Sequence, residues 1–394
     1  MEKKRWIRLL VIGLVLCGIM SMKVCAEEQR KEVSIGIEAP HAILMETTTG
    51  TVLYEKDAHV AVPPASVTKI MTMLLVFEAL EAQKIRLDDL VVVSEKAASM
   101  GGSQVFLEPN EKQTVDDLLK CIAIASANDA CVAMAEYVAG SEEAFVQQMN
   151  KRAKELGMNH TQFQNCNGLD AEGHVISAYD VALMSKELLN SHPEIHQYCT
   201  TWMDTIVHQT TKGSQEFGLS NTNKLIRQYE YSTGLKTGST SQAGFCVSAT
   251  AKKGDLHLIA VIMKGETSKS RFLDAATLLN YGFANYQLYI DTNEQRDPLE
   301  EISVIGGTSQ KVRPVYEKEF SHLLTGGESE MSIEKRIEIP EEIAAPVKKG
   351  QVLGKLNYYH QGKRLGEVSI LAESDVEAAK YFDYVKRVWL AWMM

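Results

Sequence analysis

Residues 66–83 read SVTKIMTMLLVFEALEAQ, and this stretch decides the centre of the fold. It follows Pro63-Pro64, a pair that interrupts regular structure immediately before it. Its apolar side chains recur at intervals of three or four residues, as on one face of an α-helix. They are Ile70, Met73, Leu74, Phe77 and Leu80. We therefore predict a long helix that begins at Ser66 and carries Lys69 on the same face, one turn further on.

The segments around this helix predict a mixed α/β domain, of the α+β kind, with an antiparallel sheet flanked by helices. Two patterns are typical of hairpins: residues 41–54, where apolar runs flank Thr-Thr-Gly, and residues 244–264, where β-rich runs flank Lys-Lys-Gly-Asp. Strands joined in this way pair antiparallel and need no crossover helix. The domain is assigned to residues 35–290. Further helices are expected from the cap at Thr114, over 129–139 up to Gly140, over 142–156 and over 271–286.

A second, small all-β domain is expected over residues 298–372. A polar linker at 293–298 precedes it, and short β-rich runs punctuated by Gly and Pro follow. The last segment, 375–394, predicts an amphipathic helix. Its apolar stripe ends in two tryptophans beside Lys386-Arg387, which favours an interfacial membrane anchor; the alternative is a helix that docks on the β domain. The stripe consists of Val376, Ala379, Phe382, Val385, Trp389 and Trp392.

The N-terminus has the pattern of an export signal. A basic start is followed by the apolar run 9–20, which is short for a membrane span, and Val24 and Ala26 suit the −3 and −1 positions of a cleavage site. We predict a signal peptide over residues 1–26; the alternative is an uncleaved anchor. The formal net charge of −10 argues against a nucleic-acid partner. Five scattered cysteines remain after residue 26, and we interpret them as buried apolar residues.

The first motif with chemical content is Ser66-Val67-Thr68-Lys69. A serine hydroxyl becomes a good nucleophile when a neighbouring base takes its proton, and a lysine can be that base when burial lowers its pKa. The N-terminal end of a helix also favours developing negative charge. Alone the motif is weak evidence, because an N-cap serine followed by a surface lysine would give the same Ser-x-x-Lys pattern.

Two further motifs complete the set. Ser126-Ala127-Asn128 lies in a break between two expected helices, where a second serine could relay a proton and an asparagine could bind a peptide carbonyl. Lys236-Thr237-Gly238, followed by Ser239, precedes a strand, where a lysine and a hydroxyl could hold a carboxylate and a glycine would let a substrate backbone approach. Each has an ordinary alternative as a capped loop or as a turn with a solvated lysine.

The three motifs in this order, on helix, loop and strand, form the set found in penicillin-binding proteins and class A β-lactamases. With Asn167-Gly168-Leu169-Asp170 and Ala243-Gly244-Phe245, the chain resembles the low-molecular-mass D-Ala-D-Ala carboxypeptidases over nearly its whole length beyond residue 26. The resemblance implies a penicillin-binding/β-lactamase-like fold for the first domain. It also implies β-lactam inhibitors, no metal or organic cofactor, and action at the outer face of the cytoplasmic membrane.

The resemblance further implies a role for each matched residue. Ser66 is expected to be acylated, with Lys69 as its general base and Ser126 as a proton relay. Backbone N–H groups of Ser66 and Ser239 are expected to bind the oxyanion. The remaining matched residues are expected to bind the substrate, a peptidoglycan stem peptide that ends in D-Ala-D-Ala: Asn128, Lys236, Thr237, Gly238 and Arg271. For Arg271 the alternative is a surface charge at the start of a helix.

Three rival functions remain open from the sequence. A class A β-lactamase would have Asp where Ala127 stands, and it needs a deacylating glutamate; Glu155 has matching neighbours but falls at the end of an expected helix. A D,D-endopeptidase or transpeptidase would use the same residues as a carboxypeptidase. A non-catalytic wall-binding protein would not need all three motifs.

Overall fold

The computed structural model describes residues 35–210, 213–326 and 328–393 of the protein. The expected signal peptide, residues 1–26, lies outside these described residues.

A five-stranded sheet forms the centre of the first domain, and every neighbouring pair in it is antiparallel. The strand order is β2-β1-β9-β8-β7. Both expected hairpins are confirmed, because β1 pairs with β2 and β8 pairs with β9. The strands are β1 (His41–Glu46), β2 (Val52–Lys56), β7 (Ser232–Thr240), β8 (Gly244–Lys253) and β9 (Leu256–Gly265).

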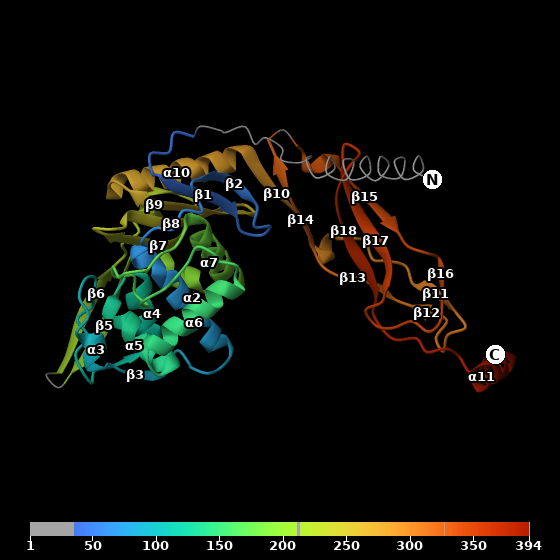
Figure 1. The fold of residues 1–394 in the computed structure, drawn as a ribbon. Helices are drawn as coiled ribbons and strands as arrows, with labels where there is room; N and C mark the ends of the chain where they lie inside the picture. Colours follow the sequence, from blue (N-terminus) through green and yellow to red (C-terminus); the bar gives the residue numbers. More distant parts are fainter. Residues whose placement is uncertain (1–34, 211–212, 327, 394) are drawn as a thin grey trace, which may run out of the picture. The chain divides into compact units, whose positions relative to one another are not determined.

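Helices cover both faces of this sheet. Figure 1 shows α10 lying along one face, with α2, α4, α5, α6 and α7 on the other side. Four of them begin at hydroxyl caps, since threonine or serine side chains accept hydrogen bonds from backbone N–H groups in the first turns of α4, α6, α7 and α10. These caps are Thr114, Ser141, Ser177 and Thr267. The helices are α2 (Lys69–Glu81), α4 (Val115–Ala123), α5 (Asn128–Ala139), α6 (Glu142–Glu155), α7 (Ala178–Ser191) and α10 (Ser268–Asn285).

Helix α2 lies in the middle of the hydrophobic core. Nine consecutive residues from Lys69 to Phe77 are buried, and α4, α5, α6 and α7 all pack against it. A helix that is apolar on nearly every side is stable only when it is buried on nearly every side, which explains this central position. The residue that opens the helix, Lys69, is therefore carried into the interior.

Two small two-stranded sheets and three short helices complete this domain. The hairpin of β5 (Met203–Thr210) and β6 (Gly213–Ser220) has no counterpart among the sequence predictions. A buried hydrogen bond joins it to the rest of the domain, because His208 Nδ1 lies 2.7 Å from Glu111 Oε1. The other elements are β3 (Leu90–Val92), α3 (Glu95–Ala98), β4 (Lys112–Thr114), α8 (Ile195–Cys199) and α9 (Leu225–Gln228).

The second domain consists of small sheets. A four-stranded sheet has the order β13-β18-β17-β15, β10 pairs with β14, and β11 lies between β12 and β16. The expected β-rich runs therefore form strands, while β10, β14 and β16 were not anticipated. The strands are β10 (Tyr286–Asp291), β11 (Ile302–Ile305), β12 (Lys311–Val312), β13 (Pro314–Tyr316), β14 (Phe320–Thr325), β15 (Ile333–Glu338), β16 (Glu342–Ala344), β17 (Val352–His360) and β18 (Lys363–Ala372).

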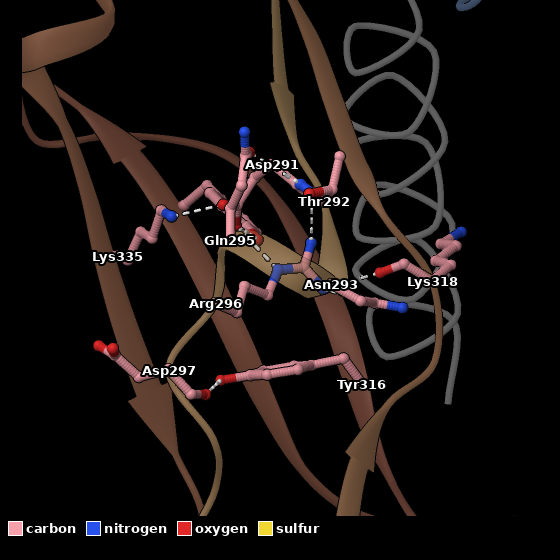
Figure 2. Close-up of polar contacts among 10 residues, drawn as sticks. Asp291, Thr292, Asn293, Gln295, Arg296, Asp297, Tyr316, Lys318 and Lys335 are labelled. Carbon is pink, nitrogen blue, oxygen red and sulfur yellow. Dashed lines mark hydrogen bonds and ion pairs between the residues drawn. The ribbon is translucent and has the colours of Figure 1, made fainter.

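A buried charge cluster fixes the expected linker against these strands (Figure 2). Arg296 Nε lies 2.9 Å from Asp291 Oδ2, and Lys335 Nζ lies 2.5 Å from Asp291 Oδ1. The Tyr358 hydroxyl donates to the same carboxylate. Burial alone would raise the pKa of Asp291, but these hydrogen bonds outweigh it and leave the pKa below its ordinary value. The residues after β10 are thus held by their side chains, with a short 3-10 turn (Asn293–Gln295) in place of an open linker.

The C-terminal helix is shorter than predicted. Helix α11 spans Tyr381–Met393 and does not begin at Asp375. Residues 376 and 378 instead form β-bridges with Val347 and Gly307, and the buried Val376 packs in the core of the β domain. Val376 and Ala379 therefore do not belong to the helical stripe. Among the described residues, no helix is both long and apolar enough to cross a bilayer.

Candidate active site

The turn that carries Ser66 is pressed between two glycines. Ser66 lies in a 3-10 turn (Ala65–Thr68) immediately before α2, rather than in the helix itself as predicted. A Cβ on Gly238 would lie 2.7 Å from the Ser66 backbone nitrogen, and one on Gly168 would lie 2.0 Å from the Ala65 carbonyl oxygen. Only glycine permits such close approach of backbone to backbone, so the glycines set the position of the serine.

Lys69 is a fully buried amine directed at Ser66. Its Nζ lies 3.0 Å from Ser66 Oγ, 2.6 Å from Asn128 Oδ1 and 2.6 Å from the Asn167 carbonyl oxygen. Burial lowers its pKa from the ordinary value for lysine. An amine with a lowered pKa within hydrogen-bonding distance of a hydroxyl can take that hydroxyl's proton.

Asn128 holds both Lys69 and the neighbouring segment 101–103 in place. Its Nδ2 donates to the Gly101 carbonyl at 2.7 Å, and its backbone N–H donates to the Ser103 carbonyl at 2.7 Å. The next side chain, Asp129, accepts from the N–H groups of residues 105 and 107. The start of α5 thereby fixes both the lysine and residues 101–107.

Ser126 and Lys236 meet from different elements. Ser126 lies between α4 and α5 with a φ of 61°, a strained conformation for a non-glycine residue, and Lys236 comes from β7. The lysine Nζ lies 2.9 Å from Ser126 Oγ. Burial and the nearby charge of Lys69 lower the pKa of Lys236 to about 7. Because the lysine donates to the Ser126 oxygen, the serine's own proton is free to point elsewhere.

The other residues of the third motif lie at the end of β7. The Thr237 hydroxyl shares a hydrogen bond of 2.7 Å with that of Thr222, and Ser239 is exposed to solvent. Gly238 lies against the Ser66 backbone, which requires a glycine here in addition to the substrate approach that the sequence suggested.

Arg271 is a buried residue rather than a surface charge. It is 6% exposed, and its Nη1 donates to the carbonyls of Gly238 and Cys246 at 2.9 and 3.1 Å. Burial lowers its pKa to about 10, and its Nε has no hydrogen-bond partner among the described residues. The guanidinium therefore supports the end of β7 from behind the third motif.

Three buried basic side chains thus lie around one short segment of β7. The hydrogen bonds that Lys69, Lys236 and Arg271 make within the described residues all go to neutral hydroxyl, amide or backbone carbonyl oxygens. Buried charges ordinarily occur with partners of opposite sign. The site is consequently suited to a ligand that brings its own negative charge.

Several contacts at the site were not foreseen from the sequence. The Asn167 carbonyl binds Lys69, Thr222 binds Thr237, and Thr240 Oγ1 donates to Asp170 Oδ1 at 2.6 Å. Asn167 and Asp170 belong to a motif that the sequence did single out, but a backbone carbonyl has no side-chain signature. Thr222 follows the hairpin of β5 and β6, and no sequence pattern marked it as part of the site.

Two interpretations that weighed against rival functions are consistent with the structure. The described cysteines are all free and buried, including Cys246, whose pKa burial raises to about 11. Glu155 is the last residue of α6, with a half-exposed side chain near Lys151 and Arg152. It is a solvated helix residue, as the sequence indicated.

Comparison with known proteins gives consistent results over most of the chain. Residues 26–267 match the D-alanyl-D-alanine carboxypeptidase family, and residues 290–378 match the penicillin-binding protein 5 C-terminal domain. The D-alanyl-D-alanine carboxypeptidase DacF of Bacillus subtilis is 41% identical and covers 99% of each chain. DacC of Escherichia coli, also a D-alanyl-D-alanine carboxypeptidase, is 33% identical and covers 97% of this chain and 94% of its own. Penicillin-binding protein 5 of Haemophilus influenzae has a similar structure, with a TM-score of 0.72, 30% identity, and coverage of 86% of this chain and 98% of its own.

Proposed function

The chain belongs to the D-alanyl-D-alanine carboxypeptidase family and is a serine-type enzyme of that activity, and on this basis we propose that Ser66 is its acylated nucleophile. The observation that carries the proposal is the buried Lys69 amine 3.0 Å from the Ser66 hydroxyl. The substrate is a peptidoglycan stem peptide that ends in D-Ala-D-Ala.

In the acylation step, Ser66 Oγ attacks the carbonyl carbon between the two terminal D-alanines. Neutral Lys69 takes the hydroxyl proton, while Asn128 and the Asn167 carbonyl hold the amine in place. The negative charge that develops on the carbonyl oxygen is bound by the backbone N–H groups of Ser66 and Ser239.

The leaving amine then needs a proton. Ser126 supplies its hydroxyl proton to the nitrogen of D-alanine as the C–N bond breaks. The ammonium of Lys236, 2.9 Å from Ser126 Oγ, replaces that proton. A lysine whose pKa lies near 7 is suited to this exchange at neutral pH.

The terminal carboxylate of the substrate supplies the missing negative charge at β7. Lys236 and Thr237 bind it, with Gly238 and Arg271 shaping and supporting that end of the strand. Water then attacks the ester on Ser66; its proton passes to the neutral Lys236 and Lys69 returns a proton to Ser66 Oγ. β-Lactams, which also present an amide carbonyl beside a carboxylate, acylate the same serine.

Mass spectrometry of the intact protein after incubation with a penicillin tests this proposal. The wild-type chain should gain one penicillin mass, and Ser66→Ala should gain none. In parallel, D-alanine release from a D-Ala-D-Ala peptide should be lost in Ser66→Ala. An adduct that persists in Ser66→Ala would contradict the assignment of the nucleophile.

The same assays separate the rival functions. Turnover of the penicillin that outpaces D-alanine release would indicate a β-lactamase, and failure of the wild type to acquire an adduct would indicate a non-catalytic protein. Transfer of the acyl group to an added amino-acid acceptor, or cleavage of cross-linked stems, would indicate transpeptidase or endopeptidase activity.

We also propose where the enzyme acts. Residues 1–26 are its signal peptide, the peptidase domain extends from residue 35 to the end of α10, and the β domain extends from β10 to Val376, beyond the 298–372 expected from the sequence. The C-terminal helix lies on the outer surface of the cytoplasmic membrane. The support for this anchor is that α11 exposes most of its large apolar side chains.

A further inference from the structure

We propose that Thr68 and His174 form a clamp that positions Ser66 by holding the carbonyl group of Ala65. The inference rests on the proposed function, because it takes Ser66 as the nucleophile. Neither clamp residue contacts Ser66 Oγ in the hydrogen-bond network of the site, so both are positioning residues.

The backbone at Ala65 needs to be held. Its φ is 50°, in the left-handed region that non-glycine residues rarely adopt, and its carbonyl oxygen lies against Gly168. The next residue is Ser66, so any relaxation of Ala65 rotates the peptide that leads into the nucleophile.

A chain of hydrogen bonds ends on this carbonyl. Thr68 Oγ1 donates to the Ala65 oxygen at 2.9 Å, and His174 Nε2 lies 2.9 Å from Thr68 Oγ1. On the other side of the ring, the Gln164 backbone N–H donates to His174 Nδ1 at 2.8 Å. Because Nδ1 accepts, the ring proton is on Nε2, and every group in the chain has one defined direction.

The surroundings keep this arrangement fixed. Thr68 is 0% exposed and His174 is 2% exposed, and the imidazole packs edge-on against Phe163 with 6.0 Å between ring centroids. Burial lowers the pKa of His174 to about 4, so the ring is neutral where the enzyme works. A neutral, buried donor with a fixed tautomer is suited to orientation rather than to proton transfer.

The clamp also gives a role to Thr68, a residue of the first motif that the proposed mechanism does not use. Thr68 lies between Ser66 and Lys69 in sequence but faces away from their shared contact, toward residue 174. Gly238 fixes the Ser66 nitrogen from one side, and the clamp fixes the preceding carbonyl from the other.

Isosteric variants of the full chain test the clamp. Thr68→Val keeps the shape and removes the hydroxyl, and Thr68→Ser keeps the hydroxyl. His174→Gln keeps a donor near the Nε2 position, and His174→Asn keeps only an acceptor near the Nδ1 position. We expect Thr68→Val and His174→Asn to lower the rate constant of acylation by a labelled penicillin roughly tenfold to a hundredfold, the effect of a small misplacement of a reacting group. Thr68→Ser and His174→Gln should stay within about threefold of the wild type, because they preserve the donor chain.

The readout separates positioning from stability. Each rate is divided by the amount of protein that forms a covalent penicillin adduct at saturation, so that unfolded protein is not counted. The melting temperature is measured alongside. The double variant Thr68→Val/His174→Asn should be no slower than the slower single variant, since both break one chain. Equal rates for Thr68→Val and the wild type, or equal effects of His174→Asn and His174→Gln, would overturn the clamp. If the wild type itself forms no adduct, the proposed function fails instead.

Discussion

A Cβ atom added to Gly238 would lie 2.7 Å from the backbone nitrogen of Ser66. It would also lie 3.0 Å from the nitrogen of Val67, and both neighbours are backbone atoms that have no rotamer to change. Strand β7 and the turn that carries Ser66 therefore approach each other through their main chains. The glycine of the Lys-Thr-Gly motif sets the distance between this strand and this turn.

Gly238→Ala is expected to push β7 and the turn that carries Ser66 apart and to misplace Ser66 relative to Lys69. Because the clash is with backbone, the turn has to shift by several tenths of an ångström. We expect the acylation rate constant to fall about a hundredfold, the usual scale for a misplaced reacting group. Stopped-flow measurement with a fluorescent penicillin checks the prediction.

A matched glycine provides the control for this variant. Gly218 lies on β6 without a positive φ, and a Cβ there meets no atom within 4 Å. Gly218→Ala should leave the rate constant and the melting temperature close to those of the wild type. Normal acylation by Gly238→Ala would show that the site tolerates a wider separation of β7 from the Ser66 turn than the backbone contact implies.

Asn128→Asp is expected to move the pH dependence of acylation toward higher pH. A carboxylate 2.6 Å from Lys69 Nζ would favour the ammonium form and raise the pKa of the lysine, by roughly one to three units for such a pair. Since the proposed base is the neutral amine of Lys69, the acid limb of the pH profile should move up by the same amount. Acylation rates measured from pH 6 to 10 report the shift.

Asn128→Ala distinguishes the effect of the added charge from the effect of the lost hydrogen bond. It removes the contact with Lys69 without adding a charge, so its rate should fall while the acid limb stays near that of the wild type. An acid limb that does not move in Asn128→Asp would mean that Lys69 is not the group that must lose a proton.

The alkaline limb of the profile is expected to report Lys236. Burial, with the charge of Lys69, lowers its pKa to about 7, so in the free enzyme the ammonium is lost as the pH rises above that value. The kcat/KM for D-alanine release should therefore fall about tenfold per pH unit above the pKa.

Lys236→Arg tests this assignment, because a guanidinium stays charged throughout the range. The variant will be slower at its optimum, since arginine does not fit the lysine's contact with Ser126. Its kcat/KM should nevertheless stay constant over the pH range in which that of the wild type declines. Lys253→Arg, an exposed change on β8, serves as the control and should keep the wild-type profile. A decline in Lys236→Arg at the wild-type pH would assign that limb to another group.

The sequence was sufficient for the elements whose signal is local. Residues 41–54 and 244–264 form hairpins because turn residues separate β-rich runs, and α4 begins at Thr114 because the hydroxyl caps the turn. The apolar residues of α2 also marked a helix. Their spacing did not reveal that the first turn is 3-10, because the close approach of Gly168 and Gly238 determines that geometry.

Features that depend on distant partners could not be predicted. The strands β5 and β6 are polar along much of their length, and the buried pair His208–Glu111 joins residues 97 positions apart. Helix α11 begins after the predicted start at residue 375 because Val376 pairs with Val347 in a β-bridge. The helical spacing of apolar residues gives no information about such a distant contact. The Asn167 carbonyl binds Lys69 through the main chain, which leaves no pattern in the side chains.

Removal of the two tryptophans of α11 is expected to weaken membrane binding. Trp389 and Trp392 are 57% and 84% exposed, and Val388, next to Trp389, is 71% exposed. Trp389→Ser/Trp392→Ser should lower the partition coefficient for vesicles of phosphatidylethanolamine and phosphatidylglycerol at least roughly tenfold. Cosedimentation measures it, and D-alanine release from a soluble peptide should not change.

An exposed apolar residue elsewhere controls for general hydrophobicity. Val352 on β17 is 55% exposed, and Val352→Ser should bind vesicles like the wild type. Equal binding by the double tryptophan variant would remove α11 as the anchor and favour another contact with the membrane.

Arg296→Met is expected to destabilise the β domain strongly. The side chains of Arg296 and Asp291 are 1% and 2% exposed, so the substitution leaves a buried carboxylate with Lys335 as its remaining cation. Breaking a buried pair by removing one partner costs about 3–5 kcal/mol.

The exposed pair of Arg336 and Glu334 offers a matched comparison, since both lie on the same domain with side chains more than half exposed. Arg336→Met should cost no more than about 1 kcal/mol, because water already screens that pair. Urea unfolding followed by circular dichroism compares the two variants, and penicillin acylation reports whether the peptidase domain stays intact. Equal midpoints for Arg296→Met and Arg336→Met would mean that the Asp291 cluster contributes no more than a surface pair. In that case, the apolar contacts of Tyr358 and Phe320, whose rings stack at 3.7 Å, would have to hold the first strands of the β domain together.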